Sequence, residues 1–294
     1  MLEIICWIVA AMAVFFLLVM AYDGSRFVVR EYRCEDKRVK KDLTMVLLSD
    51  LHSKSFGKEN QKLLGAIDRI DPDLVLIAGD MYTAGKGQET DTAGSLVCRL
   101  AQSCPVYYGN GNHEHKTRLF PEEYGNVYED YAEKIKKSGV RLLCNEKAQL
   151  PELGLDIYGL ELGRDYFGKF RQKKMEKGYL ERLMGKPLAE NYSVLIAHNP
   201  DYFADYAAWG ADLVVSGHVH GGLMRLPFLG GVISPAMKLF PKYDGGFFSH
   251  GNAKMILSRG LGSHTLPIRI FNPGELVVIR FAGRKPCGRK FDRS

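Results

Sequence analysis

Asp50 and His52 are the first residues in the sequence whose types and spacing suit metal chemistry. They directly follow a short apolar run at 45–49. In an extended chain, residues two apart project to the same side, so a carboxylate and an imidazole would leave the strand end together. Both groups bind divalent metals. A single Asp-x-His is nevertheless a weak signal, because an aspartate at a strand end is more often a turn residue.

Four further apolar runs end in residues of the same kind. In each case the polar residues follow a segment with the pattern of a buried strand. They are Asp80, Asn112 with His113, His198, and His218 with His220. Each one alone has an ordinary interpretation as a turn or helix-entry residue. Five independent strand ends of this type are improbable by chance, so the sequence predicts a metal site.

The number of candidate ligands indicates two metal ions, because one tetrahedral zinc site needs at most four. The sequence offers seven, namely Asp50, His52, Asp80, Asn112, His198, His218 and His220. Two cations about 3.5–4 Å apart, sharing one carboxylate and one hydroxide, would use all seven. Nitrogen and oxygen ligands without thiolate fit calcium poorly. We expect two divalent metal ions, with manganese as the first choice and iron, zinc or magnesium as alternatives.

The elements that would carry these residues alternate between strand and helix from residue 44 onward. Apolar runs predict strands at 45–49, 74–78, 106–108, 140–143, 155–160, 194–197, 213–216, 255–258 and 276–281. Helical spacing predicts helices around 63–70, 93–100, 128–135 and 202–208. The charged stretch 164–190 is expected to form a helix with mobile flanks. Such alternation is typical of α/β proteins, whose sites gather at the carboxyl ends of the strands.

The composition supports one large folded domain or two small ones. The chain has 294 residues, of which 46% are hydrophobic and 25% are charged, which excludes a disordered chain. A net charge of +6 suits anionic partners without demanding them. The six cysteines include no C-x-x-C pair, which argues against a zinc–cysteine site and favours reduced thiols in a cytoplasmic domain. P-loop, nucleophile-elbow and dinucleotide-binding motifs are missing.

Residues 4–21 are apolar throughout and long enough to span a bilayer, which takes about 17–25 residues. A secretory signal is the alternative, but its apolar core is normally shorter and follows a basic residue, whereas the only charged side chain before this run is Glu3. Residues 23–41 hold seven basic and four acidic side chains. The positive-inside rule then places the following domain in the cytoplasm. An exported domain is the alternative, with these charges lying on its first strand.

Taken in order, the motifs resemble the signature of the calcineurin-like metallophosphoesterases. The match runs through Asp50-x-His52, Gly79-Asp80, Gly111-Asn112-His113-Glu114, His198 and Gly217-His218-x-His220. It covers residues from about 44 to 281, and the surrounding sequence is similar to the bacterial membrane-associated branch of the family. The resemblance implies an α/β fold of the four-layer sandwich type. Two mixed β-sheets would be flanked by helices, with one N-terminal transmembrane helix in addition.

The resemblance also implies a role for each candidate residue. One metal would be held by Asp50, His52 and His220, and the other by Asn112, His198 and His218. Asp80 would bridge the two metals. His113 would not bind metal, but would donate a proton to the leaving oxygen or stabilise the transition state. The expected boundaries are an anchor at 1–22, a basic segment or first strand at 23–43, the catalytic domain at 44–281 and a basic tail at 282–294.

The resulting hypothesis is a membrane-anchored phosphoesterase with two metals. It would hydrolyse a lipid-linked or nucleotide-sugar phosphodiester, such as one of UDP-diacylglucosamine type, by hydroxide attack. The alternatives are a nuclease or phosphoprotein phosphatase with a soluble substrate, and a non-catalytic phosphate-binding scaffold. The expected partners are the phosphoester and the membrane. No nucleic acid is expected, because no basic groove with interleaved aromatic residues is evident. The sequence does not define the oligomeric state.

Two departures from the family pattern concern the choice of substrate. Leu223 stands where related sequences often have glutamine, and Glu161 matches an acidic position of the branch only partly. The segment 226–248 is also unusually apolar for a loop, and its glycines and prolines fit neither a helix nor a strand. It is either a loop packed into its own core or an apolar lip beside the metals. In the second case Lys238 and Lys242 could meet anionic headgroups.

Overall fold

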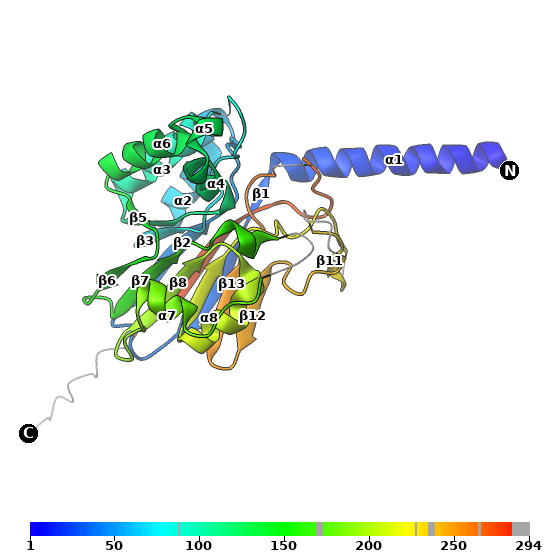
Figure 1. Ribbon diagram of the computed structural model, residues 1–294. Coiled ribbons are helices and arrows are strands. Elements are labelled where there is room, and N and C mark those ends of the chain that lie inside the picture. The colour runs from blue at the N-terminus through cyan, green and yellow to red at the C-terminus, as the bar shows by residue number, and fades with distance from the viewer. Residues whose placement is uncertain (88, 169–172, 227, 235–238, 264–265, 284–294) are drawn as a thin grey trace, which may run out of the picture.

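Two large β-sheets lie face to face in the computed structural model, and helices cover their outer sides (Figure 1). The structure describes residues 1–87, 89–168, 173–226, 228–234, 239–263 and 266–283. Each large sheet has six strands and mixes parallel with antiparallel pairs. The expected four-layer α/β sandwich is therefore confirmed.

The first sheet carries the N-terminal half of the predicted metal residues. Its strand order is β1-β14-β2-β3-β4-β5. The strands are β1 (Phe27–Glu35), β14 (Gly274–Ala282), β2 (Leu43–Leu48), β3 (Leu74–Ile77), β4 (Val106–Gly109) and β5 (Arg141–Leu143). From β2 to β5 the neighbours are parallel, whereas β14 runs antiparallel to β2. The parallel order brings the carboxyl ends of β2, β3 and β4 to one edge of the sheet.

The second sheet carries the C-terminal half of the predicted metal residues. Its order is β12-β13-β9-β8-β7-β6, with parallel neighbours from β13 to β7 and an antiparallel strand at each edge. The strands are β12 (Gly246–His250), β13 (Ala253–Leu257), β9 (Leu213–Ser216), β8 (Tyr192–Ala197), β7 (Leu155–Leu160) and β6 (Glu146–Leu150). A small ribbon of β10 (Arg225–Leu226) and β11 (Gly230–Gly231) follows β9 in sequence.

Three apolar clusters hold the layers together: one between the sheets and one on each outer side. The first sheet is covered by α2 (Gln61–Ile70), α3 (Asp91–Ser103) and α6 (Val127–Lys137), with α4 (Asn112–Leu119) and α5 (Pro121–Tyr124) beside them. The second is covered by α7 (Tyr179–Met184) and α8 (Phe203–Trp209). Because the central strands are buried on both faces, they form continuous apolar runs. That is why the sequence pattern locates them within a residue or two.

The same pattern misses β6 and β12, because several residues of each are exposed and the continuous apolar run is lost. The expected helix at 164–190 is shorter: its described part holds the six-residue α7 and a 3-10 turn at Arg164–Phe167. Residues 169–172 lie outside the described chain. The interpretation of 226–248 as a plain loop overlooks β11 and parts of β10 and β12. Residues 227 and 235–238, which include Lys238, also lie outside the described chain.

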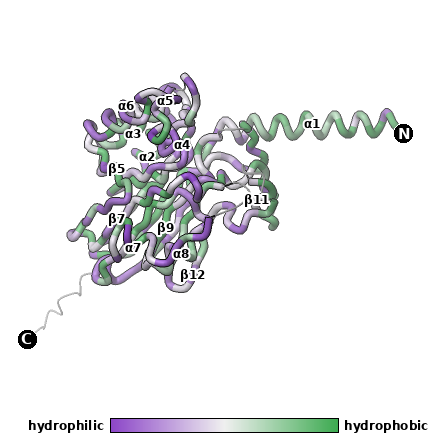
Figure 2. The backbone as a smooth tube through the Cα atoms, viewed as in Figure 1, coloured by the Kyte–Doolittle hydropathy of each residue, from purple (hydrophilic) through white to green (hydrophobic). Residues whose placement is uncertain are grey.

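Helix α1 (Leu2–Ser25) extends away from both sheets (Figure 1) and is largely hydrophobic along its length (Figure 2). It is the one helix in the described part of the chain that is long and apolar enough to cross a membrane. Asp23, near its end, is the exception to the exposure of the helix, because its side chain is buried. After Arg26 the chain enters β1, which pairs in parallel with β14. The segment expected at 23–43 thus contributes a strand to the first sheet. That α1 anchors the chain in a membrane, and that the domain lies on the cytoplasmic side, both stay predictions.

Gly159 of β7 lies where the two sheets approach each other closely, and a β-carbon there would overlap Leu143 of β5. We expect Gly159→Ala to lower the free energy of unfolding by about 1–3 kcal/mol, because a packed interior resists added volume. Gly65→Ala in α2 is the control: its β-carbon would meet only the tip of Arg69, at 3.6 Å. It should raise stability by about 0.5–1 kcal/mol. Thermal unfolding in detergent measures both, and an unchanged Tm for Gly159→Ala would contradict the tight contact.

Candidate metal centre

The carboxyl ends of five strands, from both sheets, bring the predicted residues together. Three sets of ligand atoms form there, each with all its atoms within 4.8 Å of one another. The sets are Asp50, His52 and His220; His52, Asp80 and His113; and Asp80, His198 and His218. Because His52 and Asp80 each belong to two sets, the three form one continuous cluster. Asn112 starts α4 beside it, next to His113, whose backbone N–H donates to Oδ1 of Asp80 at 2.8 Å.

Most of the clustered residues have a backbone conformation that is rare outside glycine. Positive φ angles occur at Asp50, His52, Asp80, His218 and His220. Such residues cost about 1–3 kcal/mol each and persist where the surrounding structure enforces them, typically at functional sites. The residues with positive φ are thus among those whose side chains form the cluster at the strand ends. This feature has no signature in the sequence, since none of these positions is a glycine.

Two glycines allow the strands to meet at the cluster. A β-carbon at Gly111 would overlap the carboxylate of Asp80, and one at Gly217 would overlap the carboxylate of Asp50. Each aspartate therefore lies directly against the backbone of a neighbouring loop. The Asp50 carboxylate also accepts the N–H of His218, at 3.0 and 3.1 Å to its two oxygens. Both carboxylates are almost completely buried.

Glu114 fastens the loops of β3 and β4 to each other. Its Oε2 accepts the N–H groups of Asp80 (2.9 Å) and Gly111 (3.0 Å), and its Oε1 accepts from Met81 N–H (2.8 Å) and the Tyr108 hydroxyl (2.7 Å). The side chain is fully buried, and burial raises the pKa of Glu114 to about 7. The family motif includes Glu114, but the sequence reasoning gave it no role. A glutamate in the first turn of a helix, three residues after the glycine that precedes it, is the signal that could have indicated a cap.

In His198 and His220 the ring nitrogen Nδ1 is hydrogen-bonded to a backbone carbonyl, which leaves Nε2 as the nitrogen that could bind a metal. Nδ1 of His198 lies 2.5 Å from the carbonyl oxygen of Ala78, and Nδ1 of His220 lies 3.2 Å from that of Gly262. A carbonyl only accepts, so in both rings the proton lies on Nδ1 and Nε2 faces the cluster. Nε2 of His220 is also 3.2 Å from Nε2 of His52. A cation bound between Nε2 of His220 and Nε2 of His52 could be coordinated by both nitrogens.

His113 has the opposite arrangement. Its Nδ1 accepts the backbone N–H of Ala84 at 2.9 Å, so a neutral His113 carries its proton on Nε2. That nitrogen lies 3.9 Å from Oδ2 of Asp80, at the edge of the cluster. A ring that presents N–H toward the site can donate a proton but offers no lone pair to a metal. The backbone contacts thus make His113 a donor toward the cluster, whereas His198 and His220 are arranged as metal ligands.

The charges in the cluster are unevenly balanced. Burial raises the pKa of Asp50 to about 6, with a further contribution from the charge of Asp80. Burial also opposes ionisation of Asp80, yet His198 and His113 hold its pKa well below the usual value. Burial would lower the pKa of His198, but Asp80 and Asp50 together raise it to about 10. The buried carboxylates thus favour positive charge at this position, and bound divalent cations would supply it.

The donor set fits divalent cations. Oδ1 of Asn112 is buried and has no hydrogen-bond partner in the described part of the chain. A buried amide oxygen of this kind is costly unless a donor or a cation meets it. Carboxylate oxygens, imidazole nitrogens and one amide oxygen, without thiolate, match the ligands of manganese, iron and zinc.

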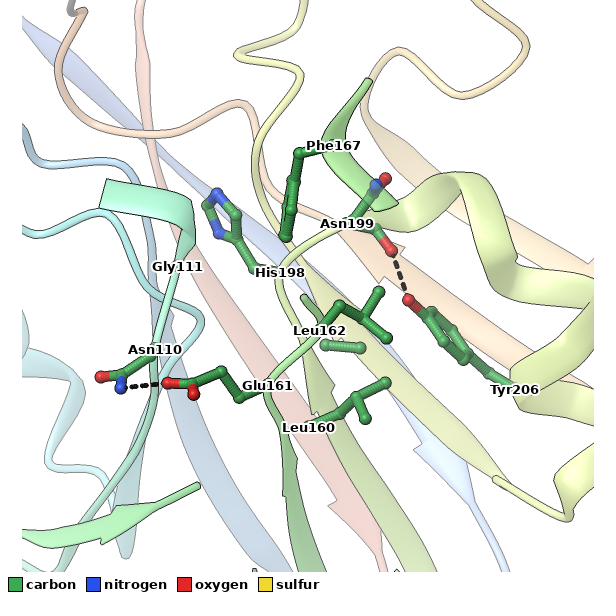
Figure 3. Close-up of a pocket in the computed structure, with 10 residues that line it drawn as sticks. Asn110, Gly111, Leu160, Glu161, Leu162, Phe167, His198, Asn199 and Tyr206 are labelled. Carbon is green, nitrogen blue, oxygen red and sulfur yellow. Dashed lines mark hydrogen bonds between the residues drawn. The ribbon is translucent and has the colours of Figure 1, made fainter. Parts of the chain in front are cut away.

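A small pocket next to His198 connects the cluster to the second sheet (Figure 3). Asn110 donates to Oε2 of Glu161 at 2.6 Å, and the Tyr206 hydroxyl donates to the carbonyl oxygen of Asn199 at 2.8 Å (Figure 3). Glu161 also pairs with Arg118. The carboxylate of Glu161 is therefore engaged by chain donors, and it ties β7 to the start of α4.

Comparison with known proteins agrees with this geometry. The family model described as calcineurin-like phosphoesterase matches residues 43–222. The metallophosphoesterase YkuE of Bacillus subtilis is 28% identical over 246 residues, covering 80% of this chain and 77% of that protein. UDP-2,3-diacylglucosamine pyrophosphatase LpxG of Chlamydia muridarum is 25% identical over 289 residues, covering 81% and 83%. Phosphodiesterase YaeI of Escherichia coli is 25% identical over 225 residues, covering 74% and 75%.

Some relatives are considerably longer than this chain. It spans 64% of the length of an uncharacterised metallophosphoesterase from Campylobacter jejuni, to which it is 26% identical over 264 residues. The family match covers more than half of the chain and includes every residue of the cluster described above. On this match and on the predicted order of its motifs, the chain belongs to the calcineurin-like phosphoesterase family.

Proposed function

We propose that the protein is a metal-dependent phosphoesterase with two divalent ions. Asp50, His52 and His220 would hold one ion, and Asn112, His198 and His218 the other, with Asp80 shared between them. The observation that carries this proposal is the separation of the histidines by hydrogen bonding. Backbone carbonyls hold Nδ1 of His198 and of His220, so both rings turn Nε2 toward the cluster, whereas Nδ1 of His113 accepts an N–H and its Nε2 carries the proton. A non-catalytic phosphate-binding scaffold would need no such proton donor.

The chain's own residues would then share the work of hydrolysis. Bound divalent ions supply charge to the phosphoryl oxygens and a reactive water at neutral pH. Asp50 and Asp80, fixed against glycine backbone, set the positions of the ligands. Nε2–H of His113 would donate to the leaving oxygen, either by a hydrogen bond that stabilises its developing negative charge or, from the imidazolium form of the ring, by proton transfer; without this donor the oxygen is expelled as an unstable alkoxide. The N–H of Ala84 keeps the proton of a neutral His113 on the nitrogen that faces the cluster.

A lipid-linked phosphoester is the substrate class that the surface supports best. The metal loop is the stretch 217–222 that carries His218 and His220. The segment after it exposes four large apolar side chains, those of Phe228, Leu229, Leu239 and Phe240. This segment, around β11, lies on the same side of the molecule as α1 (Figure 2). Phe271 links the two regions, since its ring centroid lies 6.4 Å from that of Phe15 in α1. An exposed apolar surface beside a helix of membrane-spanning length is typical of contact with the lipid interface.

A pocket of about 520 Å³ adjoins this surface and suits an amphiphile. Apolar residues line it together with Arg225 and Arg259. Arg225 also donates to the carbonyl oxygen of Gly221, next to His220, so the pocket borders the metal loop. An acyl chain beside two arginines and two cations would match a phospholipid-like ester. The relative LpxG is named for a diacylated nucleotide sugar, which has the same chemical character.

Asp80→Asn tests the shared carboxylate. The amide oxygen can still accept the N–H of His113, so the local fold should persist. Because both metals would lose a charged ligand, metal analysis should show a loss of more than one ion's share, together with loss of turnover on chromogenic diesters. Retention of two ions with normal turnover would contradict a bridging role.

His113→Ala tests proton donation apart from metal binding. Turnover should fall by roughly 10²–10⁴ with the metal content unchanged. The loss should shrink for esters with acidic leaving groups, which need less protonation. Measuring kcat across a series of leaving groups decides the matter, and equal losses for good and poor leaving groups would exclude the donor role.

Phe228→Ser combined with Phe240→Ser tests the lipid-linked substrate. Activity on a long-chain substrate in micelles should fall, whereas activity on a small soluble diester should stay the same, because the metal residues are untouched. Leu188→Ser is the control, since this exposed residue precedes β8, at the opposite end of the strand from the metals. Equal loss on both substrates would mean that the two phenylalanines serve packing, and the lipid assignment would fall.

A further inference from the structure

Asn272 is a fully buried side chain directly behind the metal loop. It precedes β14, in the connection that follows β13, and does not belong to the ligand cluster. Its Nδ2 donates to the carbonyl oxygens of His220 and Gly222, both at 2.7 Å. One amide group therefore holds the backbone on both sides of Gly221. The sequence gives no hint of this role, because Asn272 lies 52 residues from His220.

The bonded carbonyls belong to a strained stretch of chain. His220, Gly221 and Gly222 have successive φ angles of 54°, 72° and 85°. A left-handed histidine is unfavourable unless its surroundings enforce it, and a buried carbonyl without a donor is also unfavourable. Asn272 supplies both donors. A β-carbon at Gly221 would lie 2.6 Å from Oδ1 of Asn272, so the fit between this side chain and the loop is close.

The same connection also holds the His220 ring. Nδ1 of His220 bonds to the carbonyl oxygen of Gly262, as described above. The buried guanidinium of Arg269 donates to the carbonyl oxygens of Gly262, Gly260 and Asn272. Gly262 thus holds the ring of His220, and Asn272 holds its backbone.

Asn272 is in turn fixed by the N-terminal helix. Its backbone N–H donates to Oδ2 of Asp23 at 3.0 Å, and Arg26 pairs with Oδ1 of the same carboxylate at 2.8 Å. Asp23 is 2% exposed, although the apolar length of α1 is in the open. In Figure 1 the connection before β14 lies against the sheet-proximal end of α1. Two hydrogen bonds therefore lead from α1 to the backbone of His220.

We propose that Asn272 is a positioning residue for His220 and that Asp23 of α1 holds Asn272 in place. The N-terminal helix is then part of the support of one metal ligand, in addition to any role as an anchor. This inference rests on the proposed function only in that His220 is taken as a metal ligand. Its specific consequence is selectivity: a disturbance at Asp23 weakens the metal held by His220, but not the metal held by His198, whose Nδ1 bonds to Ala78 in the first sheet.

The test is a titration of the full-length protein with Co²⁺ in detergent. Binding is measured by the visible absorption spectrum of the bound ion and by isothermal titration calorimetry. For Asp23→Ala, one of two binding events should weaken by about 10–100-fold, the usual effect of removing a residue that orients a ligand. The other event should stay within about twofold of the wild type. Asp23→Asn keeps an acceptor oxygen for the Asn272 N–H and should restore most of the affinity. Ser25→Ala is the control, because its hydroxyl bonds within α1 to the carbonyl oxygen of Tyr22.

The outcomes separate this inference from the proposed function. A wild-type protein that binds fewer than two Co²⁺ ions would overturn the proposed function. Two wild-type sites that are both unaffected by Asp23→Ala would overturn the inference alone. Equal weakening of both sites with a lower Tm would also overturn it, because that pattern is general destabilisation. Asn272→Ala should reproduce the selective loss, and if this variant does not fold, Asp23→Ala decides the question by itself.

Discussion

Two like-charged carboxylates, Asp50 and Asp80, are buried together where the edges of the two sheets meet, and the structure around them depends on this charge. Desolvation and mutual repulsion make such a pair unfavourable without positive charge nearby. Histidines surround the pair, and the backbone of two glycines lies against the carboxylates. The left-handed ligand residues and the bonds of Glu114 are understandable as the means of keeping this arrangement fixed. Divalent cations would relieve the repulsion and so stabilise the fold as well as serve chemistry.

Neither sheet contains the centre by itself. Asp50, His52 and Asp80 follow strands of the first sheet, whereas His198, His218 and His220 follow strands of the second. Their relative positions are therefore set by the apolar cluster between the sheets. Substitutions in that cluster would be expected to shift the ligand sets against each other, since interiors are close-packed and transmit small displacements. Glu161 adds a polar tie across the same junction, from β7 to Asn110 and Arg118.

The sequence predicted the parts of the molecule that follow from short-range pattern. Buried parallel strands appear as continuous apolar runs, so most of them, and the polar residues that end them, were located before the structure. Edge strands such as β6 lack that run and were missed. The predicted metal residues and His113 each follow a strand that the sequence pattern located, but only the family resemblance gave them different roles, because the distinction between His113 and His198 lies in bonds to the carbonyl of Ala78 and the N–H of Ala84. Asp23 and Asn272 were missed for a related reason: a contact between residues 249 apart leaves no local trace.

The junction between α1 and β1 has a consequence for how the protein would meet its substrate. Helix α1 ends at Ser25 and β1 begins at Phe27, so one residue separates them, and Asp23 is bonded into the domain. A helix of 24 residues is about 36 Å long, enough to cross the hydrocarbon layer of a bilayer. With no slack between helix and sheet, a membrane-embedded α1 would hold the active-site opening at a constant height and angle above the lipid headgroups. A domain held in this way could not swing out into the surrounding solution. The protein would then meet a lipid-linked substrate within the plane of the membrane. The rate of encounter would depend on lateral diffusion of the two molecules in the leaflet and on the surface density of the substrate, instead of its bulk concentration.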